Sequence, residues 1–340
     1  MKSVVAEDGK ICVIDHTIPT VKSGFLLIKT LHSVISPGTE LSMLSSSQGK
    51  TVSLGYSAVG RIIDCGEGTD PFYKGELVAC YGAPYVKHSE YLLVPKTLCC
   101  SVPAGVQPRE AALAGLGAIA IHALRLANLQ FGESVVVAGL GVLGQLIAQI
   151  SNSVAYQVIP YEINEGRANL FQSITGLNTY TSIEDLAVEI KEKTNGNGAD
   201  AVMLCAGGGK SELTNESLKW LRDRGKVVIV GDIEPHFNRQ LMFAKEAQIL
   251  ISRAGGPGRY DPVYEKSAQD YPYGFIRWTE GRNIEEYLRL ILEKRIKVKS
   301  YLQHSVIFQE IHEAYEELKE KNSDVLTKVI DYNLIEEKTG

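Results

Sequence analysis

The chain has 340 residues, of which 44% are hydrophobic and 22% charged, and its formal net charge is -5 at pH 7. This composition is ordinary for a globular protein, and the length suggests two domains. The sequence has no basic stripe and no cluster of Lys and Arg interleaved with aromatic residues, so nucleic acid is not an expected partner. Neither a signal peptide nor a membrane span is expected, because the longest apolar run, 111–121, is short and broken by glycine.

Cysteine usage indicates a reducing compartment. No C-x-x-C spacing and no disulfide framework is present, so we expect reduced cysteines and a cytoplasmic protein. The cysteines are Cys12, Cys65, Cys80, Cys99, Cys100 and Cys205.

Residues 1 to about 105 are β-rich. Short apolar runs are separated by turns rich in Gly, Pro and Ser, and we expect most of this region to form a small barrel with irregular loops. The segments 35–40 and 53–57 are polar and glycine-bearing, and such loops often carry function. Strands are expected at residues 4–6, 11–14, 25–31, 60–65, 76–80 and 90–94.

After residue 105 the sequence predicts helices, and from residue 134 it predicts alternating strands and helices. Pro108 marks the first turn of a helix, and the Ala/Gly-rich run 111–127 predicts a tightly packed helix pair. From residue 134 to about 254, strands and helices alternate, which predicts a doubly wound parallel sheet of the α/β class. The expected strands are 135–138, 158–161, 201–205, 227–230 and 248–252, and the expected helices are 144–151, 166–175, 183–193, 211–221 and 242–247.

The first strand of the alternating region ends in a G-x-G-x-x-G motif. Gly139 permits a tight turn, Gly141 lets the backbone approach a pyrophosphate, and Gly144 lets the following helix pack against the strand. The N-terminus of that helix offers free N–H groups and a partial positive charge to the phosphates. We therefore predict a dinucleotide site at Gly139, Leu140, Gly141, Val142, Leu143 and Gly144.

An acidic residue after the second strand indicates NAD as the cofactor. Glu162 stands where a carboxylate binds the adenosine ribose, and it would repel a 2′-phosphate. Arg167 complicates this preference, because a nearby arginine could bind that phosphate. Ala206, in a strand end that runs on to Gly209, and Gly231 are expected beside the nicotinamide. The alternative is a plain βαβ unit with a surface glutamate.

Residues 255–282 interrupt the alternation with turns and aromatic side chains, over a length unusual for a connection. We predict that they form much of a substrate pocket, in which Arg259 and Tyr260 bind polar groups while Tyr273 and Trp278 stack on a sugar ring. The alternative is a subunit contact, which Arg and aromatic residues also favour. Helices at 284–292 and 311–319, a strand at 327–332 and a charged tail from Glu336 follow.

This order of regions resembles the medium-chain dehydrogenase/reductase superfamily, of the alcohol dehydrogenase type, over nearly the whole chain. The resemblance rests on the glycine motif, on Glu162 with Arg167, on Pro37-Gly38-Thr39-Glu40 and on the segment 90–95. It implies a substrate-binding cleft between the first two of three regions. These are a GroES-like β-barrel domain at 1–118, a Rossmann domain at 119–255, and a substrate loop with a return to the catalytic domain at 256–340.

The chain departs from the zinc-binding members at their ligand positions. Those members carry Cys where this chain has Pro37, His-Glu where it has Tyr56 and Ser57, and often Glu or Cys where it has Gly115. The four-cysteine structural lobe is missing too. Because these replacements cannot hold zinc with its usual geometry, no bound metal is expected.

Two branches of the superfamily are closer in detail. One resembles bacteriochlorophyllide dehydrogenase, and the other resembles the dehydrogenase half of bi-domain oxidoreductases found with carbohydrate genes. Segments 35–40 and 55–60 and the run 256–280 carry this resemblance, and the last of these favours the second branch. Whether a separate oxidoreductase partner acts with this chain stays open.

Without zinc, another group must polarise the substrate oxygen and exchange its proton. Thr39 matches the hydroxyl through which zinc members pass that proton. Tyr56 and His88 are equal candidates for the proton-handling group, and Glu40 is a further candidate. Each has a structural alternative, namely packing for Tyr56, a loop cap for His88 and an ion pair for Glu40.

The favoured function is a zinc-independent NAD-dependent dehydrogenase that acts on a secondary hydroxyl or ketone of a sugar or polyol. The alternatives are a zinc-free quinone or enone reductase, which Glu162 disfavours because those enzymes commonly use NADPH, and a dinucleotide-binding protein without turnover. The resemblance alone implies a homo-oligomer, a dimer or larger. The exact substrate and the direction of the reaction are not indicated.

Overall fold

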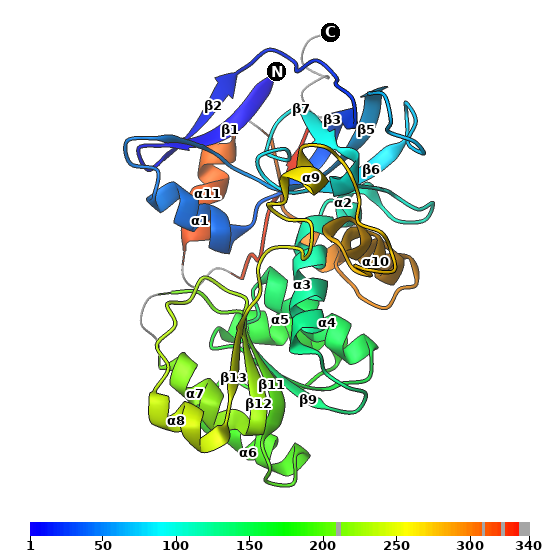
Figure 1. Cartoon of the computed structure of the whole chain (residues 1–340). Coiled ribbons are helices and arrows are strands. Elements are labelled where there is room, and N and C mark those ends of the chain that lie inside the picture. Colours follow the sequence, from blue (N-terminus) through cyan, green and yellow to red (C-terminus); the bar gives the residue numbers. More distant parts are fainter. Residues whose placement is uncertain (209–211, 308–309, 321–323, 333–340) are drawn as a thin grey trace. The chain divides into compact units, whose positions relative to one another are not determined.

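The computed structural model describes residues 1–208, 212–307, 310–320 and 324–332, and the chain forms two compact units (Figure 1). The first unit comprises Met1–Ala118, Gly255–Lys294 and the chain from Val298, and the second comprises Ile119–Ala254 with Arg295–Lys297. Three parts of the sequence prediction lie outside the described residues. They are Gly209, Ser211 at the start of the helix predicted at 211–221, and the charged tail from Glu336. No described helix has the length and apolar character needed to cross a membrane.

The first unit contains two separate sheets where the sequence predicted a small barrel. Their strands are β1 Lys2–Glu7, β2 Lys10–Asp15, β3 Phe25–Val34, β4 Thr51–Ser53, β5 Ser57–Cys65, β6 Leu77–Tyr81, β7 Tyr91–Pro95, β8 Cys99–Ser101, β14 Ser305–Val306 and β15 Val329–Asp331. Among the described residues, one sheet has the order β2-β1-β4, and the other has the order β14-β15-β3-β5-β6-β8 with β7 also paired to β3. The pairs are antiparallel apart from β14 with β15.

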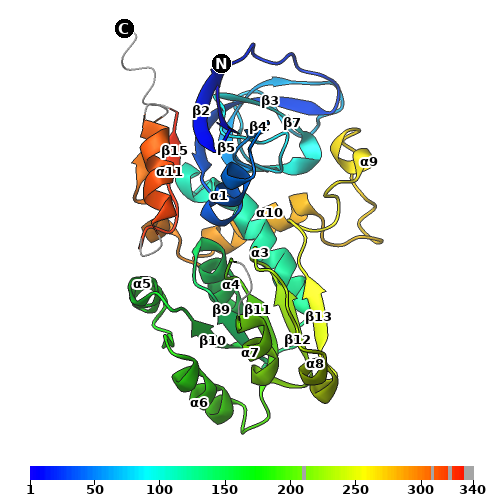
Figure 2. The ribbon, with the colours of Figure 1, turned by 90° about the vertical axis from the view of Figure 1, so that its left-hand side faces the viewer.

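Helices of the first unit cover these strands. They are α1 Pro37–Ser45, α2 Pro108–Ala111, α9 Pro262–Glu265, α10 Glu280–Leu292 and α11 Ile311–Lys319, with short 3-10 turns at Lys96–Leu98 and Lys299–Leu302. Helices α1 and α11 bury Leu44 and Tyr315 with Val4 of β1 and Ile330 of β15, and Figure 2 shows α11 beside β15. A second cluster joins β3, β5 and β6 through Leu26, Ile62 and Val78.

Helix α1 corrects one expectation. The segment 35–40 was predicted as a loop, but the helix begins at Pro37, directly after an extended Ser36. Proline suits the first helical position because its missing N–H would have no partner there. The Glu40 carboxylate also reaches back and accepts a hydrogen bond from the Ser36 N–H at 2.7 Å. The proline-glycine pair therefore starts a helix rather than a turn.

The second unit is built on a parallel sheet. Its strands are β9 Ser134–Ala138, β10 Gln157–Tyr161, β11 Ala199–Leu204, β12 Leu221–Ile229 and β13 Gln248–Ile251. Within the described residues they lie in the order β10-β9-β11-β12-β13. Its helices are α4 Val142–Ser153, α5 Glu165–Thr175, α6 Ile183–Lys193, α7 Leu213–Trp220 and α8 Arg239–Lys245, while α3 Ala114–Ala127 carries the chain in from the first unit. The predicted parallel sheet is confirmed.

A single residue completes the Rossmann strand order. Tyr180 forms an isolated parallel bridge with Tyr161 of β10. Its N–H donates to Pro160 O, and its carbonyl accepts from Glu162 N, both at 3.0 Å. Counting Tyr180 as the third strand gives the order 3-2-1-4-5-6 that is typical of dinucleotide-binding domains. The carboxyl ends of β9 and its neighbours then form the edge at which such domains bind a ligand.

Candidate active site

The turn between β9 and α4 has the features that a dinucleotide pyrophosphate requires. Gly139 has φ +95°, which L side chains rarely adopt. A Cβ added to Gly144 would lie 1.9 Å from Gly139 O, so the helix packs against the turn only because this residue is glycine. A Cβ added to Gly141 would meet no atom within 4 Å, and no side chain caps α4 at Gly141. The turn therefore fits a phosphate group close to the backbone.

Glu162 is a buried part of this turn. It is 6% exposed, which makes the alternative of a surface glutamate wrong. Its Oε2 accepts a hydrogen bond from Leu140 N at 2.7 Å, and its Oε1 accepts one from Asn164 N at 2.9 Å. A carboxylate can accept about four hydrogen bonds, so two backbone donors leave it able to accept from ribose hydroxyls. Arg167 lies in the first turn of α5, where its N–H donates to the Asn164 side chain at 2.9 Å.

Three strand ends converge beside the glycine turn. A Cβ on Gly139 would lie 2.7 Å from Ala206 N, and a Cβ on Gly231 would lie 2.2 Å from Ala206 O. The carboxyl ends of β9, β11 and β12 are therefore adjacent, as a binding edge requires. Val142 and Leu143 open α4 next to them. The structure thus brings together the predicted cofactor residues of the second unit.

In the first unit, Glu40 and His88 form a fully buried pair. Their side chains are 0% exposed, and His88 Nε2 lies 2.9 Å from Glu40 Oε2. The other ring nitrogen of His88 is 2.8 Å from Ser33 Oγ, and the Tyr315 hydroxyl donates to Glu40 Oε2. Glu40 Oε1 also accepts a hydrogen bond from the Ser36 N–H. Both Glu40 and His88 are therefore bonded to other groups of the first unit. The contact of Glu40 with His88 agrees with the structural alternative for Glu40, whereas the His88 ring bonds to two side chains rather than capping a loop.

Tyr56 lies in a different environment. Its hydroxyl donates to Ser36 Oγ at 2.5 Å and also interacts with the Thr39 side chain. Burial is the main cause that raises the pKa of Tyr56 to about 12. Its ring meets Tyr81 edge to face, with centroids 5.8 Å apart. Tyr56, Ser36 and the exposed Thr39 therefore form a cluster of hydroxyl groups at the start of α1.

The residues that the sequence resemblance aligns with zinc ligands lack the side chains of the usual ligands. Ser57 Oγ donates to Ala112 O at 2.6 Å and accepts from Gly115 N at 2.9 Å, so it holds the chain between α2 and α3 in place. Pro37, Tyr56, Ser57 and Gly115 supply no thiolate, imidazole or carboxylate, which are the usual zinc ligands. Across the described ranges, no group of three or more His, Cys, Asp or Glu is placed to hold a metal ion.

Sequence reasoning missed Tyr81, whose ring meets that of Tyr56, and Glu280, which interacts with Tyr81. Tyr81, at the end of β6, is 3% exposed, and a Cβ on Gly115 would lie 2.6 Å from its ring. Glu280, the first residue of α10, is fully buried, although a glutamate in the first turn of an amphipathic helix is ordinarily exposed. No sequence signal marks either residue, because their burial depends on segments distant in the chain.

The predicted substrate residues lie in an ordered part of the first unit. Arg259 forms an ion pair with Glu265 and donates to Ala83 O, and its side chain is 9% exposed. Its guanidinium also lies over the Tyr260 ring, 4.1 Å from the centroid. A substrate group at Arg259 would therefore compete with Glu265 and Ala83 for the guanidinium.

The aromatic residues of the same segment form a stack at the surface. The guanidinium of Arg277 lies 3.6 Å from the Trp278 centroid and 4.4 Å from the Tyr273 centroid. Tyr273 is 58% exposed and Tyr260 is 52% exposed. The stacking roles predicted for Tyr273 and Trp278 stay predictions, as does the alternative of a subunit contact.

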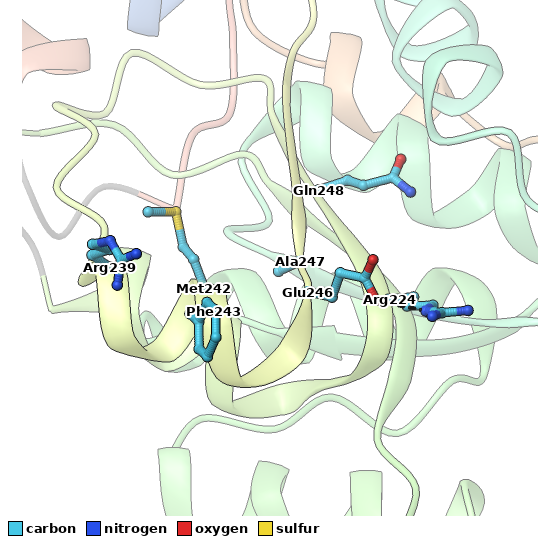
Figure 3. Close-up of a pocket in the computed structure, with 7 residues that line it drawn as sticks. All are labelled: Arg224, Arg239, Met242, Phe243, Glu246, Ala247 and Gln248. Carbon is cyan, nitrogen blue, oxygen red and sulfur yellow. Dashed lines mark hydrogen bonds and ion pairs between the residues drawn. The ribbon is translucent and has the colours of Figure 1, made fainter.

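A surface hollow of about 720 Å³ lies elsewhere on the second unit, between α8 and the β12–β13 edge (Figure 3). Phe243, 76% exposed, lies in it, and Arg224 and Glu246 form an ion pair at 2.7 Å beside it. None of the residues predicted for the site contributes to its lining, which consists of Arg224, Arg239, Met242, Phe243, Glu246, Ala247 and Gln248. The hollow is therefore separate from the predicted chemistry.

Comparison with known sequences agrees with the predicted superfamily. The family described as "Zinc-binding dehydrogenase" matches residues 142–269. Sorbitol dehydrogenase of Halalkalibacterium halodurans is 24% identical over 301 residues, which cover 79% of this chain and 80% of that protein. L-galactonate-5-dehydrogenase of Escherichia coli is 25% identical over 309 residues, 82% of this chain and 83% of that protein. The chain is an oxidoreductase. These matches support the medium-chain superfamily predicted from the sequence.

Solved structures support the same fold. Galactitol-1-phosphate dehydrogenase from Escherichia coli aligns with a TM-score of 0.79 at 18% identity, over 97% of this chain and 100% of that one. An alcohol dehydrogenase from Escherichia coli complexed with NADH has a TM-score of 0.78 at 17% identity, over 98% and 99% of the two chains. A zinc-binding dehydrogenase from Sinorhizobium meliloti bound to NADP has a TM-score of 0.75 at 16% identity, over 97% and 98%. The structural neighbours thus bind dinucleotides of both kinds.

Proposed function

We propose that this oxidoreductase is a zinc-independent, NAD-dependent dehydrogenase that interconverts a secondary hydroxyl and a ketone on a sugar or polyol. The observation that carries the proposal is the Tyr56 hydroxyl, which is bonded to Ser36 at 2.5 Å. The sequence resemblance aligns this residue with a metal ligand of the zinc members. The substrate class is supported by relatives that are named sorbitol dehydrogenase and L-galactonate-5-dehydrogenase.

The proposed cofactor is NAD, bound at the turn from Gly139 to Gly144. When bound, the nicotinamide would supply or accept the hydride. Glu162, fixed by Leu140 N and Asn164 N, is proposed to accept hydrogen bonds from the ribose hydroxyls and to repel a 2′-phosphate. Arg167 is proposed to act in the opposite sense, because its positive charge attracts a 2′-phosphate. The preference between NAD and NADP therefore depends on both charges, and a titration with both cofactors measures it.

Tyr56 is the proposed proton-handling residue. Burial raises the pKa of Tyr56 to about 12, so the phenol carries its proton at neutral pH and is proposed to donate it to the oxygen of a ketone undergoing reduction. Ser36 and Thr39 provide further hydroxyls through which that proton can be replaced from solvent. His88, the other candidate, is fully buried and bonded to Glu40 and Ser33, which supports the choice of Tyr56.

The test is a comparison of Tyr56→Phe with Tyr73→Phe, a control that removes the hydroxyl of a tyrosine that is 64% exposed. General acid–base groups contribute about 10²- to 10⁴-fold to a rate, so we expect Tyr56→Phe to lose at least about 100-fold in kcat with sugars and polyols. Tyr73→Phe should retain the wild-type rate. A protein that reduces activated C=C bonds and oxidises no polyol would instead be a quinone or enone reductase.

The same proposal includes a location in the cytoplasm and a homo-oligomer. The homo-oligomer is supported by the position of β13 at the edge of the parallel sheet, where Ile251 is 68% exposed. An exposed strand edge offers unpaired N–H and C=O groups to a second copy. The assembly is tested by the molar mass in solution.

A further inference from the structure

The first unit contains a buried carboxyl group that the proposed reaction does not use. Glu280 is 0% exposed. Its Oε1 accepts a long hydrogen bond from Gly255 N at 3.3 Å, and its Oε2 is buried without a hydrogen-bond partner among the described residues. An ionised carboxylate with an unsatisfied oxygen is costly to bury, whereas a protonated carboxylic acid is far less so. The position therefore favours the neutral acid.

The charges that surround Glu280 lead to the same conclusion. Arg259 from the segment before α9 and Glu265 from α9 form a direct ion pair, so the one guanidinium is already balanced. Tyr81 of β6 and Tyr264 of α9 are the other titratable groups that interact with the carboxyl. An ionised Glu280 would add a second carboxylate beside Arg259. Burial, only partly opposed by Arg259, accordingly raises the pKa of Glu280 to about 8.

The absence of a side chain at Gly255 brings the carboxyl of Glu280 next to the Tyr81 ring. A Cβ added to Gly255 would lie 2.7 Å from Tyr81 Cε1 and 3.2 Å from Glu280 Oε1, so the ring edge and the carboxyl approach the same point. On the opposite ring edge, a Cβ on Gly115 would lie 2.6 Å from Tyr81 Cδ2. The ring is thus held between two glycines. Burial, and after it a negative charge on Glu280, raises the pKa of Tyr81.

Tyr81 connects this acid to the hydroxyl cluster. Its ring meets the Tyr56 ring edge to face, with centroids 5.8 Å apart and planes at 75°. The Tyr56 hydroxyl in turn holds Ser36 Oγ at 2.5 Å. Tyr81 therefore links the two residues within the first unit, through an electrostatic interaction with Glu280 and a ring contact with Tyr56.

We propose that Glu280 is a positioning residue that acts on the Tyr56 site through Tyr81, and that the site works with Glu280 as the neutral acid and is inhibited when this residue ionises. The proposal rests on the role proposed for Tyr56. Its physical reason is repulsion, because an unbalanced carboxylate behind Tyr81 disfavours the negative charge that develops on the reacting oxygen beside Tyr56. A neutral carboxylic acid exerts no such repulsion.

The experiment compares wild type with Glu280→Gln, which mimics the neutral acid in shape, and with Glu285→Gln, which removes an exposed carboxylate from the same helix. In wild type, kcat should fall as Glu280 ionises, near pH 8, and level off at the lower rate of the ionised form. In Glu280→Gln this alkaline decline should disappear, and in Glu285→Gln it should stay. An unchanged decline in Glu280→Gln would overturn the proposal. A wild-type decline that follows the fraction of unfolded protein, measured at the same pH values, would also overturn it, because it would show a merely structural role.

A second measurement keeps the inference testable if polyols are not the substrates. The near-ultraviolet absorbance of tyrosine responds to a charge placed next to its ring, so wild type should show a spectral transition when Glu280 ionises. That transition should be missing from Glu280→Gln, weaker in Tyr81→Phe, where Tyr264 still interacts with the carboxyl, and present in full in Glu285→Gln. A wild type without turnover but with this transition would refute the proposed function alone. A transition that persists in Glu280→Gln would refute the coupling of Glu280 to Tyr81.

Discussion

Replacing Glu280 by glutamine should remove a pH dependence of folding stability. The pKa of this carboxyl rises from an ordinary 4.5 to about 8 in the folded chain, mainly through burial. Between these two values the folded chain holds a proton that the unfolded chain has released. The free energy of unfolding contributed by Glu280 is therefore full below pH 4.5 and is lost as pH rises to about 8.

The size of the effect follows from the two pKa values. Each pH unit over which the folded chain holds one extra proton changes the stability by about 1.4 kcal/mol. Over the interval, the loss reaches at most about 5 kcal/mol, a large part of the stability of an ordinary domain. Glu280→Gln cannot ionise, so relative to wild type it should gain stability steadily as the pH is raised.

Urea unfolding at a series of pH values measures this difference. The free energy of unfolding of Glu280→Gln minus that of wild type should increase between about pH 5 and pH 8 and then level off. Glu285→Gln supplies the control, because Glu285 is exposed on the same helix. A difference between Glu280→Gln and wild type that is constant across this range would refute the reasoning, since it would mean that Glu280 ionises alike in both states.

Three further predictions concern the second unit and the assembly. Gly144→Ala would place a Cβ 1.9 Å from Gly139 O, so α4 must shift, and we expect a lower melting temperature together with at least about tenfold weaker NADH binding. Fluorescence titration should show tighter binding of NADH than of NADPH because of the buried Glu162, and equal or tighter NADPH binding would contradict this. Light scattering at micromolar concentration should give the mass of a dimer or larger assembly, whereas the mass of one chain would contradict the proposed pairing at β13.

The parallel sheet and its glycine turn could be predicted because their signals are local. The apolar runs at β9 and β11 are buried throughout, and the motif from Gly139 to Gly144 follows directly on β9. Tyr180 carries no such signal, because a strand reduced to one bridged residue has no periodicity. Helix α1 was missed because a proline-glycine pair is found in turns as well as at helix starts.

The first-unit site was only partly predictable because its contacts are long-range. His88 and Glu40 were named as candidates, but 48 residues separate them, and their mutual bond is visible only in the fold. Tyr315 reaches Glu40 from 275 residues away. Glu280 looks like an ordinary first-turn acid until Gly255, Arg259 and Tyr81 are placed around it. Tyr56 was found because it stands at a position defined by the family resemblance.

The central claim is that Tyr56 replaces the metal as the group that handles the substrate proton. The most direct test is turnover of purified protein whose zinc content has been measured, with NAD and a panel of sugars and polyols, for wild type and Tyr56→Phe. We predict activity without stoichiometric zinc, insensitivity to a chelator, and a loss of at least about 100-fold in kcat for Tyr56→Phe. About one zinc per chain, with activity abolished by the chelator and restored by zinc, would contradict the account.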